Sequence, residues 1–159
     1  MNTPKVVITH HAVSLTSHTV KDVDNWHRVR WPGFVSKAGY HVGYHYVIEW
    51  DGKVTQTREH HEDGAHCIGM NSSSIGVCFM GNFDLHMPSD AQMASWRALY
   101  GNLRKTYPNI PTYPHRRYAN KSCHGKLLSD DFFTVEAQIA SLKENLARLK
   151  SLLASLIKK

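Results

Sequence analysis

Two histidine-containing segments, far apart in the chain, carry residue types that bind transition metals. His10 and His11 close a short run of β-branched residues, and His115 lies eight residues before Cys123 in a segment without hydrophobic periodicity. Two imidazoles and one thiolate are a common donor set for zinc. Three protein ligands leave the fourth tetrahedral position open, whereas structural sites usually take four. The pattern therefore favours a catalytic metal site.

Lys121 adds a cation beside this donor set. It lies two residues before Cys123, so both side chains point the same way if the segment is extended. An ammonium there would ease the negative charge of a metal thiolate and could meet an oxyanion. We expect no chemical role for the other two cysteines. Cys67 is interpreted as a partly buried thiol without function, and Cys78 as a small hydrophobic residue in an apolar strand. Three cysteines are too few, and odd in number, for a disulfide scaffold.

Hydrophobic patterning predicts the elements that would position these residues. We expect strands at 6–10, 44–50, 53–58 and 74–80, a loop at 108–126, and helices that begin at Thr19, Ser89 and Thr134. Asp51-Gly52 is a hairpin signal between two strands, and Ser89 begins a capping box. The first helix should turn Val20, Val23, Trp26 and Val29 toward the core. The fold class is α/β (α+β), with a central mixed sheet flanked by helices.

Composition limits the class of protein. A chain of 159 residues that is 42% hydrophobic and 20% charged fits one soluble domain and excludes disordered, collagenous and membrane-spanning classes. The longest apolar-rich stretch, Ser151 to Ile157, is too short to cross a bilayer. The first residues lack the pattern of a secretory signal, so we expect synthesis in a cytoplasm.

The C-terminal segment combines positive charge with a heptad pattern. Its last twenty residues carry five of the cations of a chain whose net charge is +6: Lys143, Arg148, Lys150, Lys158 and Lys159. Alternating intervals of four and three separate its apolar residues Val135, Ile139, Leu142, Leu146, Leu149, Leu153 and Leu156. We expect a helix whose end protrudes, either as a self-associating coiled coil, giving a homo-oligomer, or as an amphipathic helix on anionic outer-membrane lipid.

Two details weigh between these alternatives. Leu152 and Ile157 widen the stripe beyond a strict heptad seam, which favours membrane contact or a larger bundle over a dimer, and the concentrated positive charge slightly favours lipid. Alternatively, the part of the helix before about Leu146 folds back onto the core of the domain. We therefore divide the chain into a catalytic domain at 1–140 and a cationic amphipathic extension at 141–159.

Several segments together resemble a known family. They are Val-Val-Ile-Thr-His-His at 6–11, Gly-Tyr-His-Tyr-Val-Ile-Glu-Trp-Asp-Gly-Lys-Val at 43–54, Gly-Ala-His-Cys-Ile-Gly-Met-Asn-Ser-Ser-Ser-Ile-Gly-Val-Cys at 64–78, and His115 through Lys121-Ser-Cys123. In order and spacing they resemble zinc N-acetylmuramoyl-L-alanine amidases, of the superfamily that includes peptidoglycan-recognition proteins. The similarity is greatest to small single-domain phage lysozymes, or endolysins, and covers roughly residues 5 to 140.

The resemblance assigns roles to individual positions. It implies the zinc ligands His10, His115 and Cys123, the catalytic pair Tyr44 and Lys121, and the groove residues His66 and Asn71. His11 is left as a packing residue or one behind the ligands. Trp31, beside Pro32-Gly33, is the tryptophan that we expect in the groove. One position departs from the family pattern, because His124 follows the ligand cysteine where the family usually has proline.

The implied activity is hydrolysis of the amide bond between N-acetylmuramic acid and L-alanine in peptidoglycan. Zinc would activate water, and Tyr44 and Lys121 would stabilise the oxyanion. The protein would act as a phage or prophage endolysin, reaching the cell wall after release.

Two other functions remain as alternatives. A non-catalytic peptidoglycan-binding module would use the same groove, but that branch of the family characteristically lacks the ligand cysteine. A regulatory role through polymerase or nucleic-acid binding rests only on Arg116-Arg117 and the basic tail, without the interleaved aromatics of a strand-binding surface. We do not expect nucleic acid as a partner.

Overall fold

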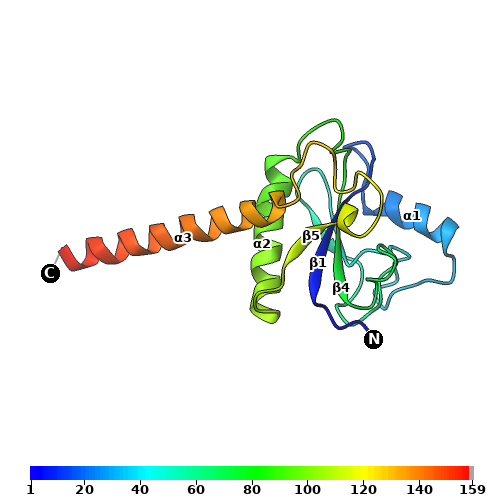
Figure 1. Cartoon of the computed structure of the whole chain (residues 1–159), viewed down its shortest axis with the longest axis horizontal. Coiled ribbons are helices and arrows are strands. Elements are labelled where there is room, and N and C mark those ends of the chain that lie inside the picture. Colours follow the sequence, from blue (N-terminus) through cyan, green and yellow to red (C-terminus); the bar gives the residue numbers. More distant parts are fainter. Residues whose placement is uncertain (158–159) are drawn as a thin grey trace.

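The computed structural model describes the backbone of residues 1–157, with all of their side chains except those of 140, 141, 156 and 157. Five strands form one mixed sheet in the order β3-β2-β4-β1-β5 (Figure 1). They are β1 (Val6–His11), β2 (Tyr46–Ile48), β3 (Val54–Gln56), β4 (Ser74–Phe79) and β5 (Thr112–Pro114). Only the β2–β3 pair is antiparallel among the described strands. The mixed sheet predicted from the sequence is confirmed.

Three α-helices and one 3₁₀ turn complete the fold. They are α1 (Val20–Arg30), α2 (Asp90–Thr106), η1 (His115–Arg117) and α3 (Phe132–Ile157). Both predicted N-caps are present, since Thr19 and Ser89 each form a capping box with the residue three positions later. These caps fix where α1 and α2 begin, and therefore how each meets the sheet.

The main core lies between the sheet and the helices α2 and α3. Phe79 of β4 stacks on Phe133 with ring centroids 4.5 Å apart, and Trp96 packs edge-on against the same ring. The Trp96 indole N–H donates to the Phe133 carbonyl at 2.9 Å, so this buried polar group is paired. The first turn of α3 is thereby anchored to the sheet.

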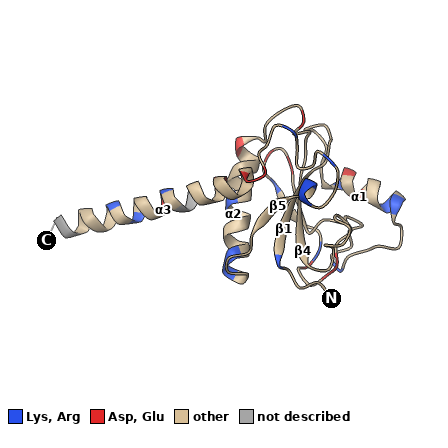
Figure 2. Cartoon of the chain, viewed as in Figure 1, with Lys and Arg blue, Asp and Glu red and all other residues tan. Residues whose placement is uncertain are grey.

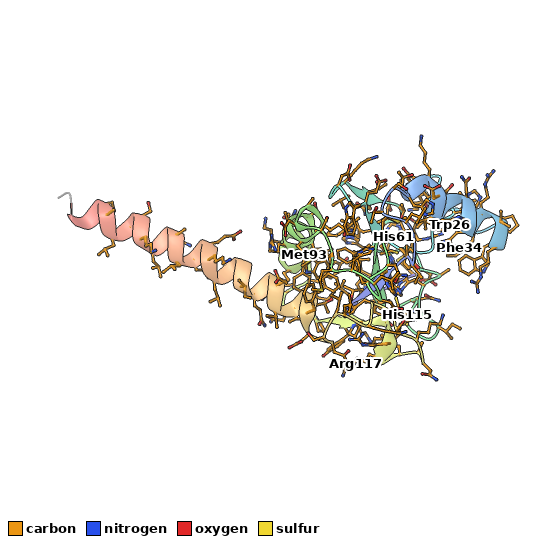
Figure 3. The ribbon with its side chains drawn as sticks, turned by 90° about the horizontal axis from the view of Figure 1, so that it is seen from above. Trp26, Phe34, His61, Met93, His115 and Arg117 are labelled. Atoms are coloured by element: carbon orange, nitrogen blue, oxygen red, sulfur yellow. The ribbon has the colours of Figure 1, made fainter. Side chains whose placement is uncertain are left out.

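The predicted inward face of α1 is only half right. Val20 and Val23 are buried against Val42, Val47 and Met80. Trp26 and Val29, however, are 44% and 84% exposed, and Trp26 lies on the outer surface of the helix (Figure 3). The cluster that α1 covers is small and is filled by the first turns of the helix. Its last turn is basic and lies beyond this cluster.

The segment 108–126, predicted as a loop, contains a strand and a 3₁₀ turn. β5 pairs in parallel with β1 at the sheet edge, with Val7 opposite Thr112 and Thr9 opposite Pro114. A strand of three residues that ends in proline gives little periodicity, and an edge position tolerates the missing N–H of proline. This unpredicted strand brings His115 to the sheet.

Helix α3 extends far beyond the rest of the fold (Figure 1). Phe133 is buried and Ala137 packs against the core, but Leu142 and Leu146 are 67% and 54% exposed. The protruding helix predicted from the sequence is confirmed, and the alternative in which it folds back is wrong for these residues. Figure 2 shows its basic residues spaced along the protruding part of the ribbon. Lys158, Lys159 and the side chain of Leu156 lie outside the described residues.

No helix in the described part of the chain is both long enough and apolar enough to span a bilayer.

Candidate metal centre and active-site cavity

Parallel pairing brings the two candidate histidine ligands together. Because Thr9 lies opposite Pro114, the residues that follow them, His10 and His115, are neighbours at the same end of the sheet. Their ring centroids are 4.5 Å apart, and both residues are buried. Ends of parallel strands commonly carry functional residues in α/β sheets, because the loops that follow them converge there.

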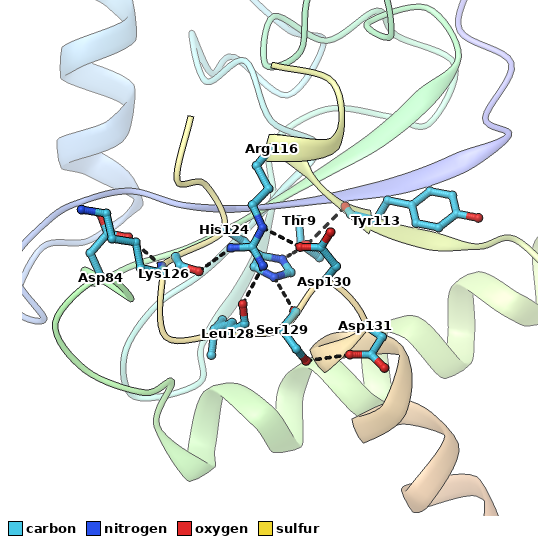
Figure 4. A network of polar contacts seen from close by, with 11 residues as sticks. Thr9, Asp84, Tyr113, Arg116, His124, Lys126, Leu128, Ser129, Asp130 and Asp131 are labelled. Carbon is cyan, nitrogen blue, oxygen red and sulfur yellow. Dashed lines mark hydrogen bonds and ion pairs between the residues drawn. The ribbon is translucent and has the colours of Figure 1, made fainter. Parts of the chain in front are cut away.

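A polar network holds the loop that delivers Cys123 (Figure 4). Arg116 pairs with Asp130 and donates to the carbonyl oxygens of Gly125 and Leu128 at 2.7 and 2.6 Å. Asp84 accepts hydrogen bonds from the Ser122 hydroxyl and the Lys126 backbone. These bonds fix the chain on both sides of Cys123, so the thiol has a defined position.

His124, where the family usually has proline, is an integral part of this loop. It is buried, its Nε2 donates to the Ser129 carbonyl at 3.0 Å, and its Nδ1 accepts from the Thr9 hydroxyl at 2.6 Å (Figure 4). Thr9 precedes the candidate ligand His10. The imidazole therefore ties the loop to β1 directly behind the site.

The three predicted ligands form one cluster. Single donor atoms of His10, His115 and Cys123 all lie within 4.8 Å of one another, and all three residues are buried. Nδ1 of His10 is 3.7 Å from Cys123 Sγ. At a tetrahedral zinc, with bonds of about 2.0–2.1 Å to nitrogen and 2.3 Å to sulfur, two such atoms are about 3.5 Å apart. The arrangement fits a zinc ion with little movement.

Protonation also suits a metal site. Burial, followed by the neighbouring imidazoles of His66 and His115, keeps the pKa of His10 well below its ordinary value, and burial lowers the pKa of His115. Both rings are therefore neutral near pH 7, the form that binds metal. Burial raises the pKa of Cys123 to about 12, with Lys121 acting in the opposite direction. A cation bound between the three residues would offset the cost of the thiolate.

Tyr44 lies beside this cluster. Its ring centroid is 5.0 Å from that of His10. Burial and the nearby thiols of Cys78 and Cys123 raise the pKa of the phenol well above 10, so the hydroxyl keeps its proton. Cys78 is buried in β4 as predicted, yet it also lies close to the candidate site.

A cavity of about 560 Å³ opens in front of the cluster. Its lining includes the predicted residues Trp31, Tyr44, His66, Asn71 and Lys121. All eight predicted site residues thus meet in one place. Sequence reasoning missed His27 and Arg30, which also line the cavity from α1. The only signal for them was the basic last turn of that helix.

His27 has a definite role in the wall of the cavity. Its Nδ1 accepts a hydrogen bond from the Gly43 backbone at 2.9 Å, and its ring lies 5.5 Å from that of Tyr44. Burial lowers the pKa of His27 to about 4, so the ring is neutral. It therefore holds the segment that carries Tyr44.

Two predicted residues make contacts that their sequence context did not reveal. Asn71 accepts hydrogen bonds from the backbone N–H groups of His66 and Cys67, both at 2.9 Å. His11 packs against Phe83 and accepts from the Phe83 backbone at 2.9 Å. Asn71 therefore shapes the loop that presents His66, and His11 is a packing residue behind the ligands.

A larger hollow of about 760 Å³ lies between α2 and α3. Its lining includes Arg97, Arg104, Ala137 and Glu144, and none of the predicted site residues. The predicted site residues therefore all lie at the smaller cavity.

Comparison with known proteins identifies similar chains. The model of a family described as N-acetylmuramoyl-L-alanine amidase matches residues 1–126. The endolysin of Enterobacteria phage K11 is 32% identical over 109 residues, which are 65% of this chain and 68% of that protein. The endolysin of Escherichia phage T7 is 33% identical over the same shares. The solved structure of the amidase LysC from Clostridium intestinale has a TM-score of 0.72 at 24% identity, covering 86% of this chain and 87% of its own.

The buried His45 predicts a pH dependence of stability. Its Nδ1 accepts from the Gly76 backbone and its Nε2 donates to the Glu62 carbonyl. Burial lowers its pKa from 6.5 to about 4, so between these values the unfolded chain binds the extra proton and stability falls as the pH drops. His45→Gln should remove up to about 1.4 kcal/mol per pH unit of this slope.

Urea unfolding from about pH 7 to 4.5, with chelator present to exclude metal linkage, measures this slope. The matched control is His61→Gln, because the His61 side chain is 41% exposed. Equal slopes for wild type and His45→Gln would contradict the prediction.

Proposed function

Since this chain belongs to the N-acetylmuramoyl-L-alanine amidase family, we propose that His10, His115 and Cys123 hold a zinc ion and that the adjacent cavity binds peptidoglycan. The enzyme hydrolyses the amide bond between N-acetylmuramic acid and L-alanine, and its phage relatives make it an endolysin that acts on the cell wall. The observation that carries the zinc assignment is the convergence of three buried donors on one point.

A bound zinc ion would supply Lewis-acid polarisation of the scissile carbonyl and activation of water. Its ligands come from three separate segments, namely β1, η1 and the loop held by Arg116. Three protein ligands leave room for substrate or water, which is the catalytic form of such sites.

Tyr44 stabilises negative charge on the carbonyl oxygen as amide cleavage begins. Its hydroxyl keeps its proton, because burial raises its pKa, and so it can only donate a hydrogen bond there. A preorganised donor of this kind contributes roughly 3 kcal/mol to the barrier reduction. The buried setting strengthens the bond, since little water competes.

Lys121 provides a positive charge at the same cavity. Its side chain is exposed, and it lowers the pKa of both Cys123 and His115, which places its ammonium near the cluster. An exposed ammonium exchanges protons with solvent. We therefore assign to Lys121 the delivery of a proton to the leaving amine of alanine.

The outer cavity suits a sugar-peptide substrate. Trp31 is half-buried there, and the Arg30 guanidinium lies 4.7 Å from its ring centroid. A tryptophan face is a suitable surface for a sugar ring, and the cations of Arg30 and Lys121 suit carboxylates of the stem peptide. Asn71 and His66 also line this cavity.

The alternative functions receive less support. Cys123 completes the donor set that a purely binding module lacks. Arg116 is engaged by Asp130 and two carbonyls, and Arg117 lies over the Tyr113 ring at 3.9 Å. Arg116 is therefore occupied within the protein, and Arg117 alone is a weak basis for a nucleic-acid surface.

Removal of the thiolate should remove both metal and activity. The wild-type protein should hold about one zinc and release alanine amino groups from murein without new reducing sugars. Cys123→Ser should lose both, because a hydroxyl is a far poorer zinc ligand. Elemental analysis and end-group assays measure this, with Cys67→Ser as a control for a buried cysteine outside the cluster. Full zinc and activity in Cys123→Ser would overturn the ligand assignment.

Tyr44→Phe separates chemistry from metal binding. This variant removes a hydrogen-bond donor and no ligand, so zinc content should stay near one while turnover falls at least tenfold. Initial rates of turbidity loss on murein, alongside zinc analysis, give both values. An unchanged turnover would show that the hydroxyl stabilises nothing in the transition state.

For the C-terminal extension, 141–159, we propose that α3 binds an anionic lipid surface, while residues 1–140 carry the catalysis. Successive helical residues turn by about 100°, so Val135 and Ile139 lie almost opposite Ala137, the residue that packs on the core. Glu144 lines the hollow beside α2 on that inner side. The leucine stripe therefore faces away from the enzyme's own body.

Charge around the stripe favours lipid over a second copy of the chain. Lys143 and Lys150 directly follow Leu142 and Leu149 and border the stripe, as Glu136 follows Val135. Glu144 lies on the inner side. Glu136 pairs with Arg97 at 3.1 Å. In a parallel coiled coil the two lysines would face Gln138 and Asn145, so no ion pair would support the dimer.

Truncation after Leu142 should keep hydrolysis of isolated murein and lose binding to phosphatidylglycerol vesicles. The truncated form should also lose lysis of intact cells that bear an outer membrane. Lys143→Gln with Lys150→Gln should weaken vesicle binding on the order of thirtyfold, since each juxtamembrane cation contributes about 1 kcal/mol. Phosphatidylcholine vesicles are the control surface. A truncated form that changes from dimer to monomer and binds vesicles as before would establish the coiled coil instead.

A further inference from the structure

The ring of His66 occupies a slot between two glycines. A Cβ added at Gly76 would lie 2.6 Å from His66 Cδ2, and one added at Gly64 would lie 2.5 Å from the same atom. Any side chain at either position would displace the ring. The backbone of His66 is held as well, by the bond that its N–H donates to Asn71. The fold therefore fixes this imidazole independently of any ligand in the cavity.

A chain of hydrogen bonds then determines which nitrogen carries each proton. The Ser74 hydroxyl donates to the Met70 carbonyl at 2.7 Å, which leaves its oxygen to accept from His66 Nε2 at 3.4 Å. With its proton on Nε2, the neutral His66 ring has an acceptor at Nδ1. That atom lies 3.1 Å from Nε2 of His10, which must be the donor.

The consequence appears at the other side of the His10 ring. When Nε2 of His10 carries the proton, Nδ1 has a free lone pair, and this is the atom 3.7 Å from Cys123 Sγ. We infer that His66 is a positioning residue, whose Nδ1 fixes the tautomer and ring plane of His10 so that His10 Nδ1 binds the metal. The inference rests on the zinc site proposed above.

Both nitrogens of His66 are engaged in this chain, so neither is free to hydrogen-bond substrate. Only the ring itself contributes to the cavity wall. Partners behind a histidine ligand typically account for 10- to 100-fold in metal affinity, because they orient the ring and raise its basicity. Ser74, at the buried start of β4, is the last member of this series of hydrogen bonds. Because its hydroxyl donates to the Met70 carbonyl, it determines the direction of the bonds to His66 and His10.

The test compares zinc affinity, measured by chelator competition, with kinetics on soluble muropeptide. His66→Phe fills the slot without an acceptor and should weaken zinc binding about 10- to 100-fold. His66→Asn places a carbonyl oxygen near the position of Nδ1 and should recover most of that loss. The visible absorption of the Co²⁺-substituted protein should change in His66→Phe and return toward wild type in His66→Asn.

Ser74→Ala provides a second route that leaves His66 in place. It should weaken zinc binding several-fold, whereas Ser72→Ala, at an exposed neighbouring serine, should not. Thermal unfolding of each metal-free variant checks that the fold is intact. Wild-type zinc affinity in both His66→Phe and Ser74→Ala, with only a higher KM, would overturn the inference and make His66 a substrate contact. Absence of stoichiometric zinc in the wild-type protein would instead overturn the proposed metal site.

Discussion

The parallel pairing of β1 with the short strand β5 is the constraint on which the site depends. One pair, Thr9 opposite Pro114, determines that His10 and His115 leave the sheet side by side. Strand β4 holds the other side of β1 and places Cys78 next to His10. A shift of one residue in either register would turn the His10 side chain to the opposite face of the sheet. The remaining parts of the site are arranged around a position that the sheet has already fixed.

Polar side chains around this position hold the loops that bring the candidate residues together. Arg116, His124 and Asn71 each use a side chain to hold backbone groups of the loops that carry Cys123 and His66. Each lost partner would leave a buried donor or acceptor unpaired, at a cost of about 1–3 kcal/mol. These bonds therefore favour the loop arrangement that places Cys123 and His66 at the cavity.

Much of this was predictable from residue spacing. The strands predicted at 6–10 and 74–80, the caps at Thr19 and Ser89, and the long final helix all rest on strong local patterns. The structure contains each of them, with β1 at Val6–His11 and β4 at Ser74–Phe79. The candidate site residues were found because their types and order resemble a family with the same arrangement. Local pattern and family resemblance both placed the candidate site at the end of the first strand.

The remainder could not be predicted, because it depends on contacts between distant residues. β5 is three residues long and ends in proline, so only its pairing with β1 makes it a strand. Trp26 and Val29 follow the spacing of an inward face, but the cluster beneath α1 ends before it reaches them. His27 and Arg30 enter the cavity only because α1 lies across its mouth, and no spacing within the helix reveals this.

The way in which α3 is attached also bears on how such a protein can diversify. In the described chain, the last residue that packs on the main core is Ala137, and the helix continues from there to Ile157. Sequence change in the exposed turns therefore meets no packing constraint from the sheet or from the ligand loops. Mutations can therefore accumulate on this part of the helix without disturbing the positions of His10, His115 and Cys123.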